Sequence, residues 1–571
     1  MVRGGYACGG RGRTIPACME SGCTPLGVTE GSARVWRLEW LTAARCRWIL
    51  AGLILFGVLS HIHYLTNDCP LDLSGDEAQY WDWSRRLDLS YYSKGPLVAY
   101  IIRASCAVFG DTMPAVRLPA VLLAVGTTLV TYGLARKLFG SDRVALGTVL
   151  LNHLVPMFVA GSMLMTIDPP FFFCWALATW FAAKAVLDGR GWAWVAMGIA
   201  IGVGFLAKYA MFLWLPGLMV FLLVDRESRR KLASAGPWVS VGIALLFTIP
   251  VMVWNAQHGW VSMRHVAKQT GTSADSEFSL ENPLEFVGSQ IGAVGPMLAV
   301  ILVGAVVYAV GRWGKDDPRR RQMRFLVCMG LTYFVIVGAD SFRTKIQVNW
   351  PAPAYFSLMI LAAYFLGTRM KDAATWKRWR GWLWGTVGFG VMCMPIAHDT
   401  EMVYPLVARV SRALKKEPTA KWDPSYKLRG WAELGGHVSG QLRLLRGDAI
   451  VLCEEYQTAA EMGFYVEGQP RTYYAGSWFF PPATPEAKDR QKRRSQYDVW
   501  EDRQLDRKDL TGREAIYIGH SPPAELVAAF QTMEPLPECR IERRGIRLRT
   551  FEMWLGRGFK GMRRPPEQGN Y

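Results

Sequence analysis

The chain has 571 residues, of which 51% are hydrophobic, and it includes 24 Trp and 26 Phe. This composition excludes a single soluble domain of ordinary make-up and indicates membrane helices. The net charge of +18 raises the alternative of nucleic-acid binding. Much of that charge lies in short loops between apolar runs, where retention of Lys and Arg on the cytoplasmic side explains it. We therefore expect no nucleic-acid partner.

Runs of about 20 apolar residues with few charges are typical of helices that cross some 30 Å of hydrocarbon. Lys208 and Tyr209 interrupt a long apolar stretch at 191–224, which we interpret as two short helices. The sequence then predicts about eleven membrane helices, at 48–64, 117–135, 144–164, 169–187, 191–206, 208–224, 237–254, 286–311, 325–339, 351–367 and 382–398.

The distribution of Lys and Arg orients these helices. One set of loops is rich in both residues and is expected in the cytoplasm: 135–143, 184–190, 225–231, 311–324 and 369–380. The predicted parts are a cytoplasmic segment at 1–46, disordered unless the true start lies later, a membrane domain at 47–398 with an outward loop at 65–113, and an outward domain at 399–571. In the outward loop, 76–88 and 99–108 have the spacing of two amphipathic helices lying along the membrane surface.

The tail after residue 399 alternates strand-like and helix-like runs, which is typical of a small α/β domain. The segment 481–502 is polar and rich in Pro, and predicts a long loop. The eleven cysteines lack metal-cluster spacing, although Cys453 and Cys539 could pair in an exported domain. The predicted strands are 449–456, 515–519 and 541–554, and the predicted helices are 459–466 and 522–533.

Two adjacent acids follow the first predicted membrane helix, in the run Ser74-Gly75-Asp76-Glu77-Ala78-Gln79-Tyr80-Trp81. A carboxylate within hydrogen-bond reach can take the proton of an acceptor hydroxyl as that hydroxyl attacks an anomeric carbon. Asp76 is the candidate base. The alternative is purely structural, because Ser74-x-x-Glu77 is also the pattern of a helix capping box.

A further acid, Asp168, lies between two long apolar runs in Thr166-Ile167-Asp168-Pro169-Pro170, on the same outer face. A carboxylate at the membrane edge is costly and often functional. It can equally be an N-cap, with Pro169 at the favoured first position of a helix. The two interpretations are compatible.

Four basic residues on the outer face depart from the positive-inside trend. A phosphate at the bilayer surface is a natural partner for them, because fixed cations stabilise it as a leaving group. Snorkelling of each side chain to the interface is the alternative. These residues are Lys94, Lys208, Arg343 and Lys345.

With the acid pair, Lys94-Gly95-Pro96 and Asp168-Pro169-Pro170 in this order, the chain resembles the GT-C superfamily of membrane glycosyltransferases. The resemblance is greatest to bacterial family 39/83 members, which include protein O-mannosyltransferase-like, Rgt-type and aminoarabinose-transferase-like enzymes. It covers about residues 48–367, and Gln347-Val348-Asn349-Trp350-Pro351 is similar to a further segment of this group.

The resemblance implies an α-helical polytopic GT-C-like fold with a C-terminal periplasmic α/β domain, in the inner membrane of a bacterium. It also implies inverting transfer of a sugar from a polyprenyl-phosphate donor to a periplasmic lipid, glycan or protein. By position, Asp76, Glu77 and Asp168 match the catalytic acids and Lys94 matches a ligand of the donor phosphate. Lys208, Arg343 and Lys345 are further candidates for that phosphate.

Other side chains in the same motifs are candidates for substrate binding: Tyr80, Tyr91, Tyr92 and Asn349. The tail resembles soluble domains attached to some GT-C proteins, which implies contact of Ser495-Gln496-Tyr497-Asp498 with acceptor or donor. Ser93 stands where the aminoarabinose transferase has a glutamate of a metal site. No cofactor is therefore assigned, and a divalent metal stays open.

Two other functions compete with sugar transfer. A transporter or lipid flippase would also use charged residues near helix ends. Against it, the sequence shows no internal repeat, and the acids and cations collect on one face. The second alternative is a membrane-anchored module that binds envelope polymer without chemistry.

Overall fold

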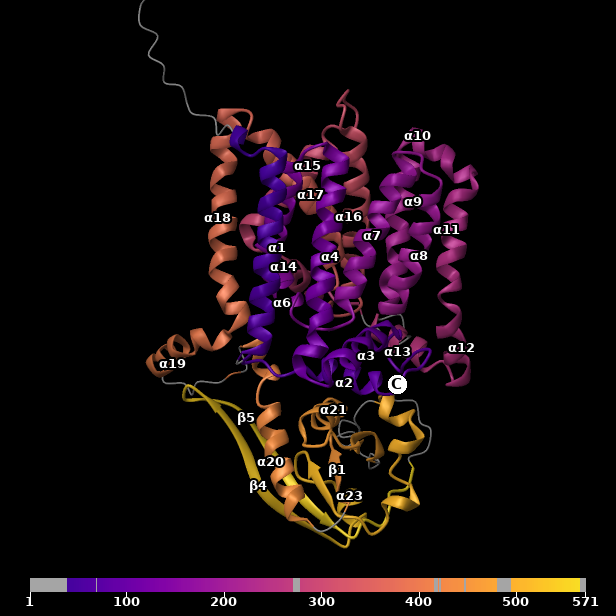
Figure 1. Ribbon diagram of the computed structural model, residues 1–571, viewed down its shortest axis with the longest axis vertical. Helices are drawn as coiled ribbons and strands as arrows, with labels where there is room; N and C mark the ends of the chain where they lie inside the picture. Colours follow the sequence, from indigo (N-terminus) through magenta and orange to yellow (C-terminus); the bar gives the residue numbers. More distant parts are fainter. Residues whose placement is uncertain are drawn as a thin grey trace, which may run out of the picture.

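The computed structural model describes residues 38–67, 69–270, 278–414, 420, 423–445, 448–479 and 494–564. Figure 1 shows two layers: long helices stand side by side in one, and a smaller α/β part covers their ends in the other. Every predicted membrane run lies on one or two helices. The main helices of this layer are α1 (Ala43–Thr66), α4 (Met113–Phe139), α5 (Asp142–His153), α6 (Pro156–Gly161), α7 (Asp168–Val186), α8 (Trp192–Ala207), α9 (Leu215–Val224), α11 (Ala235–Leu246), α12 (Ile249–Gln257), α14 (Glu281–Val294), α15 (Pro296–Val310), α16 (Arg320–Asp340), α17 (Ala352–Arg369) and α18 (Ala373–His398).

Among the described residues, four helices are long and apolar enough to cross a membrane, or up to six if each of two bent pairs is one span. The predicted insertion in a membrane is confirmed, whereas the number of eleven spans stays a prediction. The predicted helix at 286–311 is not continuous, because α14 and α15 meet at an angle of 103°, and its count as a single span stays a prediction. Gly295 has a φ of 89° and Pro296 lacks an N–H, and both interrupt the helix.

The packing of this layer is that of a membrane domain. The central helix α17 is buried from Ala352 to Ala363. The outer helices α1 and α18 instead expose apolar side chains such as Phe56 and Val391. Such exposure is stable only where lipid, rather than water, surrounds the helix.

Three short helices lie across the ends of the long ones: α2 (Gly75–Ser84), α3 (Leu97–Phe109) and α13 (Val261–Gln269) (Figure 1). The two predicted helices of the outward loop are confirmed as α2 and α3. The position of α2 along the membrane surface stays a prediction, but the helix has no exposed face from Glu77 to Ser84, since all these residues are buried. The cause is the C-terminal part, which covers the side of α2 away from the long helices.

The C-terminal part contains one five-stranded sheet in the order β2-β1-β3-β5-β4. Its strands are β1 (Ile450–Cys453), β2 (Thr472–Tyr474), β3 (Ala515–Ile518), β4 (Thr532–Arg543) and β5 (Ile546–Arg557). Strand β1 is parallel to its neighbours β2 and β3, and β5 is antiparallel to its neighbours β3 and β4. The helices around the sheet are α20 (Trp431–Leu444), α21 (Tyr456–Tyr465) and α23 (Ala524–Ala528).

The alternation of strands and helices was predicted, but two boundaries were wrong. A turn at Arg544 and Gly545, both with positive φ, divides the predicted strand 541–554 into a hairpin. The predicted helix 522–533 ends at Ala528 because β4 begins soon after it. Cys453 and Cys539 are free, since β3 and β5 lie between their strands. Most of the predicted loop 481–502 falls outside the described residues.

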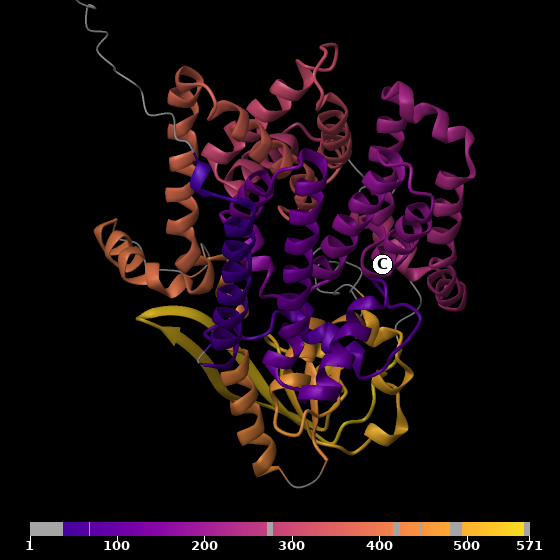
Figure 2. The ribbon, with the colours of Figure 1, turned by 45° about the horizontal axis from the view of Figure 1, so that its top comes forward.

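Buried polar contacts hold the C-terminal part against α2. Arg503 donates to Asp82 at 3.1 and 3.3 Å, and the Tyr497 hydroxyl donates to the same carboxylate at 2.9 Å. The three side chains are buried. The Tyr92 N–H also donates to the Gln496 side chain at 2.6 Å. In the turned view of Figure 2 the same elements remain in contact, so the two layers form one packed body.

Candidate active-site cavity

A cavity of about 1080 Å³ lies where the ends of the long helices meet α2, α13 and α21. One part of its wall is apolar and includes Leu213, Ile336 and Val337, and the other part is polar. Seven residues singled out from the sequence line it, although they come from distant parts of the chain: Asp76, Tyr80, Lys94, Asp168, Lys208, Arg343 and Asn349.

Asp76 lies in the first turn of α2, where the helix dipole favours a carboxylate. The Ser74 side chain accepts from the Glu77 N–H at 3.2 Å, and the Glu77 side chain accepts from the Ser74 N–H at 2.9 Å. This capping box is the structural alternative named for the motif, and it is present. It fixes the turn that carries Asp76 at the cavity wall.

Glu77 lies outside the cavity lining, and its assignment as a catalytic acid is wrong. Its buried carboxylate accepts from Arg117 at 2.9 and 3.0 Å and from the Met165 N–H at 2.8 Å. With the capping contact, both oxygens are occupied. Glu77 therefore joins α2 to α4 and to the segment before Asp168, and has no oxygen left to face a substrate.

Asp168 is the polar link between three segments. One carboxylate oxygen accepts from Lys208 Nζ at 2.9 Å, and the other accepts from Asn349 Nδ2 at 2.5 Å. The helix α7 begins at Asp168 itself, after Ile167 as the N-cap residue, so the N-cap interpretation of Asp168 is wrong. The carboxylate instead orients a cation and an amide at the cavity.

Lys94 reaches the cavity from a tight loop between α2 and α3. The Tyr91 N–H donates to the Lys94 carbonyl at 3.2 Å. The next residue must be glycine, because a Cβ on Gly95 would lie 2.2 Å from the Leu206 carbonyl oxygen. Gly95 thus lets the loop approach the end of α8 and brings the lysine to the cavity.

Lys345 was a wrong candidate for the phosphate site. Its Nζ lies 2.5 Å from Glu285 Oε1, and its side chain is 71% exposed. Arg343, two residues earlier, lines the cavity. Both residues are basic and lie in the same short segment. The fold places Arg343 at the cavity and leaves the Lys345 side chain exposed to solvent.

Of the four tyrosines proposed for substrate binding, Tyr80 alone lines the cavity. Burial, and then the carboxylates of Asp76 and Asp168, raise the pKa of Tyr80 well above its ordinary value, so the phenol keeps its proton. Tyr91 stacks on Trp83 with ring centres 4.4 Å apart, and its hydroxyl donates to backbone carbonyls. The prediction that Tyr91 contacts substrate is therefore wrong.

The same correction applies to Tyr92 and Tyr497. Tyr92 is buried against the His265 ring, with ring centres 5.5 Å apart. The Tyr497 hydroxyl is bound to Asp82. Both side chains belong to the contact between the outward loop and the C-terminal part, and neither faces the cavity.

The C-terminal part supplies wall residues that the sequence did not indicate. Tyr456 and Gln457, at the start of α21, line the cavity beside Asp76. Their approach requires glycine at position 75, because a Cβ there would lie 2.6 Å from the Gln457 Cβ. One turn along α21, Glu461 is fully buried, and neither carboxyl oxygen has a hydrogen-bond partner among the described residues.

Further lining residues missed in the sequence lie on α2, on α13, at the outer ends of membrane helices or in the loop before α17. They include Gln79, Tyr209, His265, Gln269, Tyr333, Asp340 and Gln347. Gln79 and Gln347 lie in motifs that were singled out, so their position was a usable signal. Ser93 also lines the cavity, and within the described residues no group of three or more His, Cys, Asp or Glu side chains is placed to hold a metal ion.

Solved structures share this architecture. The crystal structure of ArnT from Cupriavidus metallidurans bound to undecaprenyl phosphate superposes with a TM-score of 0.59 at 18% identity, covering 90% of this chain and 98% of that one. The apo structure of the same enzyme gives 0.57. The chain has the fold of this enzyme.

Sequence comparison agrees with this likeness. Residues 93–254 match the model of the dolichyl-phosphate-mannose-protein mannosyltransferase family. The chain is 30% identical over 321 residues to the lipid A galacturonosyltransferase RgtD of Rhizobium johnstonii, covering 56% of this chain and 64% of RgtD. It is 31% identical over 185 residues to the undecaprenyl phosphate-alpha-4-amino-4-deoxy-L-arabinose arabinosyl transferase of Pseudomonas paraeruginosa, covering 31% and 32%. The chain thus matches less than two thirds of either relative's length, and the predicted resemblance to the GT-C superfamily is confirmed.

Proposed function

We propose that the chain is an inverting glycosyltransferase that moves a sugar from a polyprenyl-phosphate donor to a hydroxyl of a lipid. The observation that carries the proposal is the meeting of Asp76 with Lys94, Lys208 and Arg343 around one cavity at the boundary of the apolar layer. The activities for which the two relatives are named, transfer to lipid A and transfer from undecaprenyl phosphate, support a lipid-phosphate donor and a lipid acceptor.

A polyprenyl-phosphate donor has an apolar chain and a charged phosphate, and the wall of the cavity has an apolar side and a basic side to match. Leu213, Ile336 and Val337 form an apolar side next to the membrane helices, suited to the polyprenyl chain. The phosphate would lie against Lys94 and Arg343. Fixed cations that stabilise the departing phosphate contribute more in a closed cavity than in water, because the local dielectric is lower.

Asp76 would act as the general base. As the acceptor oxygen forms its bond to the anomeric carbon, the carboxylate takes the hydroxyl proton, and the bond from that carbon to the phosphate oxygen breaks. The polyprenyl phosphate leaves with the bonding electrons. Attack on the face opposite the phosphate inverts the anomeric centre.

Asp168 would act by positioning. Its contacts to Lys208 and Asn349 hold a cation and an amide at fixed places in the wall. Loss of the carboxylate would free both side chains without removing the base. In this mechanism the catalytic acid predicted at Asp168 therefore contributes by positioning rather than by contact with the reacting atoms.

The proposal includes a topology. The side that carries α2, α13 and the C-terminal part would be the periplasmic side of a bacterial inner membrane, as the Lys and Arg distribution predicts. The loops rich in positive charge would then lie in the cytoplasm. Labelling of single introduced cysteines from either side of the membrane tests this orientation.

The central experiment uses purified full-length protein with two synthetic donors, a polyprenyl phosphate carrying a hexuronate and one carrying an amino-pentose, and lipid A as acceptor. Transfer of either sugar, detected by mass spectrometry, supports the proposal and identifies the sugar class. Asp76→Asn is expected to lose about 10²–10⁴-fold in rate, the usual contribution of a general base. Asp316→Asn, which changes an exposed acid in a loop on the opposite side, is the matched control.

Transfer by Asp76→Asn at the rate of the control variant would remove Asp76 from the base role. Absence of transfer from both donors, by folded protein in lipid nanodiscs, would contradict the choice of donors and acceptor. Uptake or flipping of labelled lipid by the same preparation would instead favour the transporter alternative.

A further inference from the structure

A short helix, α19 (Tyr404–Ala413), follows α18 through the single turn η4 (Thr400–Val403). It lies crosswise to α18, at the level where the long helices end and the C-terminal part begins, and it extends away from both (Figures 1 and 2). The turn of the β4–β5 hairpin lies beside its start in both views. The cavity described above is lined by other elements.

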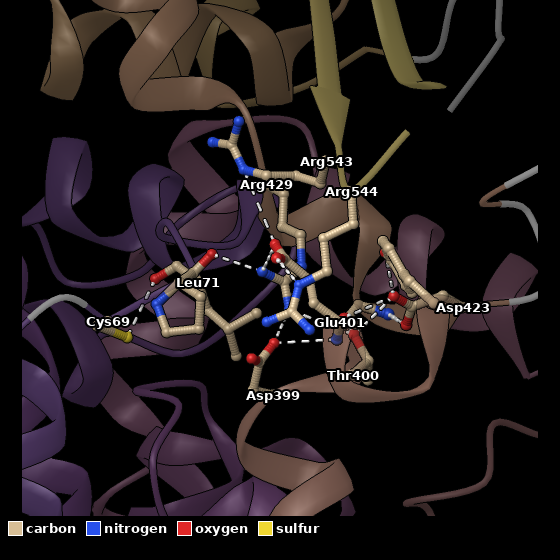
Figure 3. A network of polar contacts seen from close by, with 12 residues as sticks. Cys69, Leu71, Asp399, Thr400, Glu401, Asp423, Arg429, Arg543 and Arg544 are labelled. Carbon is tan, nitrogen blue, oxygen red and sulfur yellow. Dashed lines mark hydrogen bonds and ion pairs between the residues drawn. The ribbon is translucent and has the colours of Figure 1, made fainter. Parts of the chain in front are cut away.

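A buried ion-pair network fixes the corner from which α19 extends (Figure 3). The buried Arg429 side chain lies 3.0 Å from Asp399 and 2.6 Å from Glu401. Arg543 and Arg544, in the hairpin turn, lie 3.8 and 3.6 Å from the same Glu401. The direction of α19 is therefore set by the packed body, and the hairpin turn is held next to it.

One face of α19 is apolar and exposed. Tyr404 and Val407 pack on the core of the C-terminal part. Residues four apart share a helix face, so an adjacent face carries a continuous apolar stripe. Its members and their exposed fractions are Met402 55%, Leu406 61%, Val410 49% and Leu414 64%.

The preceding helix α18 also exposes apolar side chains, such as Val391 and Met392, which are each 58% exposed. An exposed stripe of this size marks an interaction surface. Because α19 lies at the end of a membrane helix and runs crosswise to it, the stripe is at the depth where acyl chains meet headgroups. The chain leads directly from the exposed apolar side chains of α18 to this stripe, which favours the bilayer itself as the occupant over a second protein.

The charges around the stripe are positive. Arg409 and Arg412 are exposed on α19, and in sequence this helix contains no acid. The neighbouring hairpin segment 540–549 contains five arginines and one glutamate, and Arg544 and Arg547 are exposed at its turn. Arginine clusters beside a membrane surface attract anionic headgroups, and their planar guanidinium groups suit phosphate.

We infer that α19 and the hairpin turn form a binding site for anionic phospholipids. The apolar stripe enters the leaflet on the side of the C-terminal part, and the four exposed arginines contact lipid phosphates. The site attaches the C-terminal part to the bilayer at a place remote from the cavity. It goes beyond the proposed transfer reaction and does not depend on it.

The test uses the full-length chain in phosphatidylcholine nanodiscs that contain a trace of photoactivatable phosphatidylglycerol or photoactivatable phosphatidylcholine. After illumination, mass spectrometry maps the labelled peptides. Both probes are expected to label lipid-facing peptides of α18, which serve as the internal positive control. Peptides of α19 are expected to carry at least threefold more label from phosphatidylglycerol than from phosphatidylcholine.

Two double variants separate the apolar and the charged contributions. Leu406→Ser with Val410→Ser is expected to reduce labelling of α19 by both probes. Arg409→Gln with Arg412→Gln is expected to remove the preference for phosphatidylglycerol and to keep labelling by phosphatidylcholine.

Arg513→Gln, beside the end of β5 opposite the hairpin turn, is the matched control and should label like the wild type. Labelling of α18 without labelling of α19 would overturn the proposal. Equal labelling of wild-type α19 by the two probes, or an unchanged preference in the arginine variant, would overturn the role of the charges. Melting temperatures within the error of the wild-type value confirm that each variant is folded.

Discussion

The contact between Asp82 and Arg503 offers the sharpest test of how the C-terminal part is held against α2. In Arg503→Met the chain keeps a side chain of similar length but loses the cation. Asp82 then stays buried, and its carboxylate keeps two polar contacts, the Tyr497 hydroxyl at 2.9 Å and the partly exposed Arg85 guanidinium at 3.9 Å. Removal of one member of a buried ion pair costs about 3–5 kcal/mol. At 1.36 kcal/mol per factor of ten, the open form becomes roughly 10²- to 5 × 10³-fold more populated.

Hydrogen exchange of α2 and of residues 494–510 measures this opening directly. The double variant Asp82→Asn with Arg503→Met removes both charges, and it should be less destabilised than Arg503→Met alone, because no uncompensated charge stays buried. Exchange in Arg503→Met within a factor of two of wild type would refute the reasoning. So would a double variant whose cost equals the sum of the two single costs.

Three further variants test other features of the site. Gly95→Ala should raise the donor KM at least tenfold by displacing Lys94, whereas Gly242→Ala, where a Cβ meets no atom within 4 Å, should not. Burial raises the pKa of Glu461 above its ordinary value of 4.5, so the stability of the fold should fall as the pH rises above about 4.5. Glu461→Gln should therefore melt like the wild type near pH 4 but at a higher temperature than the wild type at pH 8. Gln457→Met keeps the packing on α2 and removes the amide. If Gln457 contacts the sugar, the KM for acceptor or donor should rise at least fivefold while the melting temperature is unchanged. Unchanged kinetics would exclude the contact.

The sequence predicted much of the cavity because its motifs are local and lie on one side of the membrane helices. Asp76, Lys94, Asp168 and Arg343 were found from charge placed where the bilayer makes charge costly. That argument depends on hydropathy and loop charge alone. It requires no knowledge of which helices are neighbours.

The errors arose where a contact joins distant segments. Glu77 appeared equivalent to Asp76, but its carboxylate binds Arg117, 40 residues later, and the Met165 N–H, which lies still farther along the chain. The membrane helix at 286–311 appeared continuous because its composition is apolar throughout, although Gly295 and Pro296 stand inside it. Tyr456 and Gln457 had no signal, since nothing local shows that α21 covers α2.

The wall that α21 contributes has a consequence for the order in which the protein becomes active during synthesis. A growing chain presents Asp76 and Lys94 long before α21 has been made, and Asp82 meets Arg503 only 421 residues later in the sequence. Until then the acid and the cations border an open surface that water can enter. Under the proposed function, the cavity that would hold the donor is therefore completed only when the C-terminal part has been made and packs on α2.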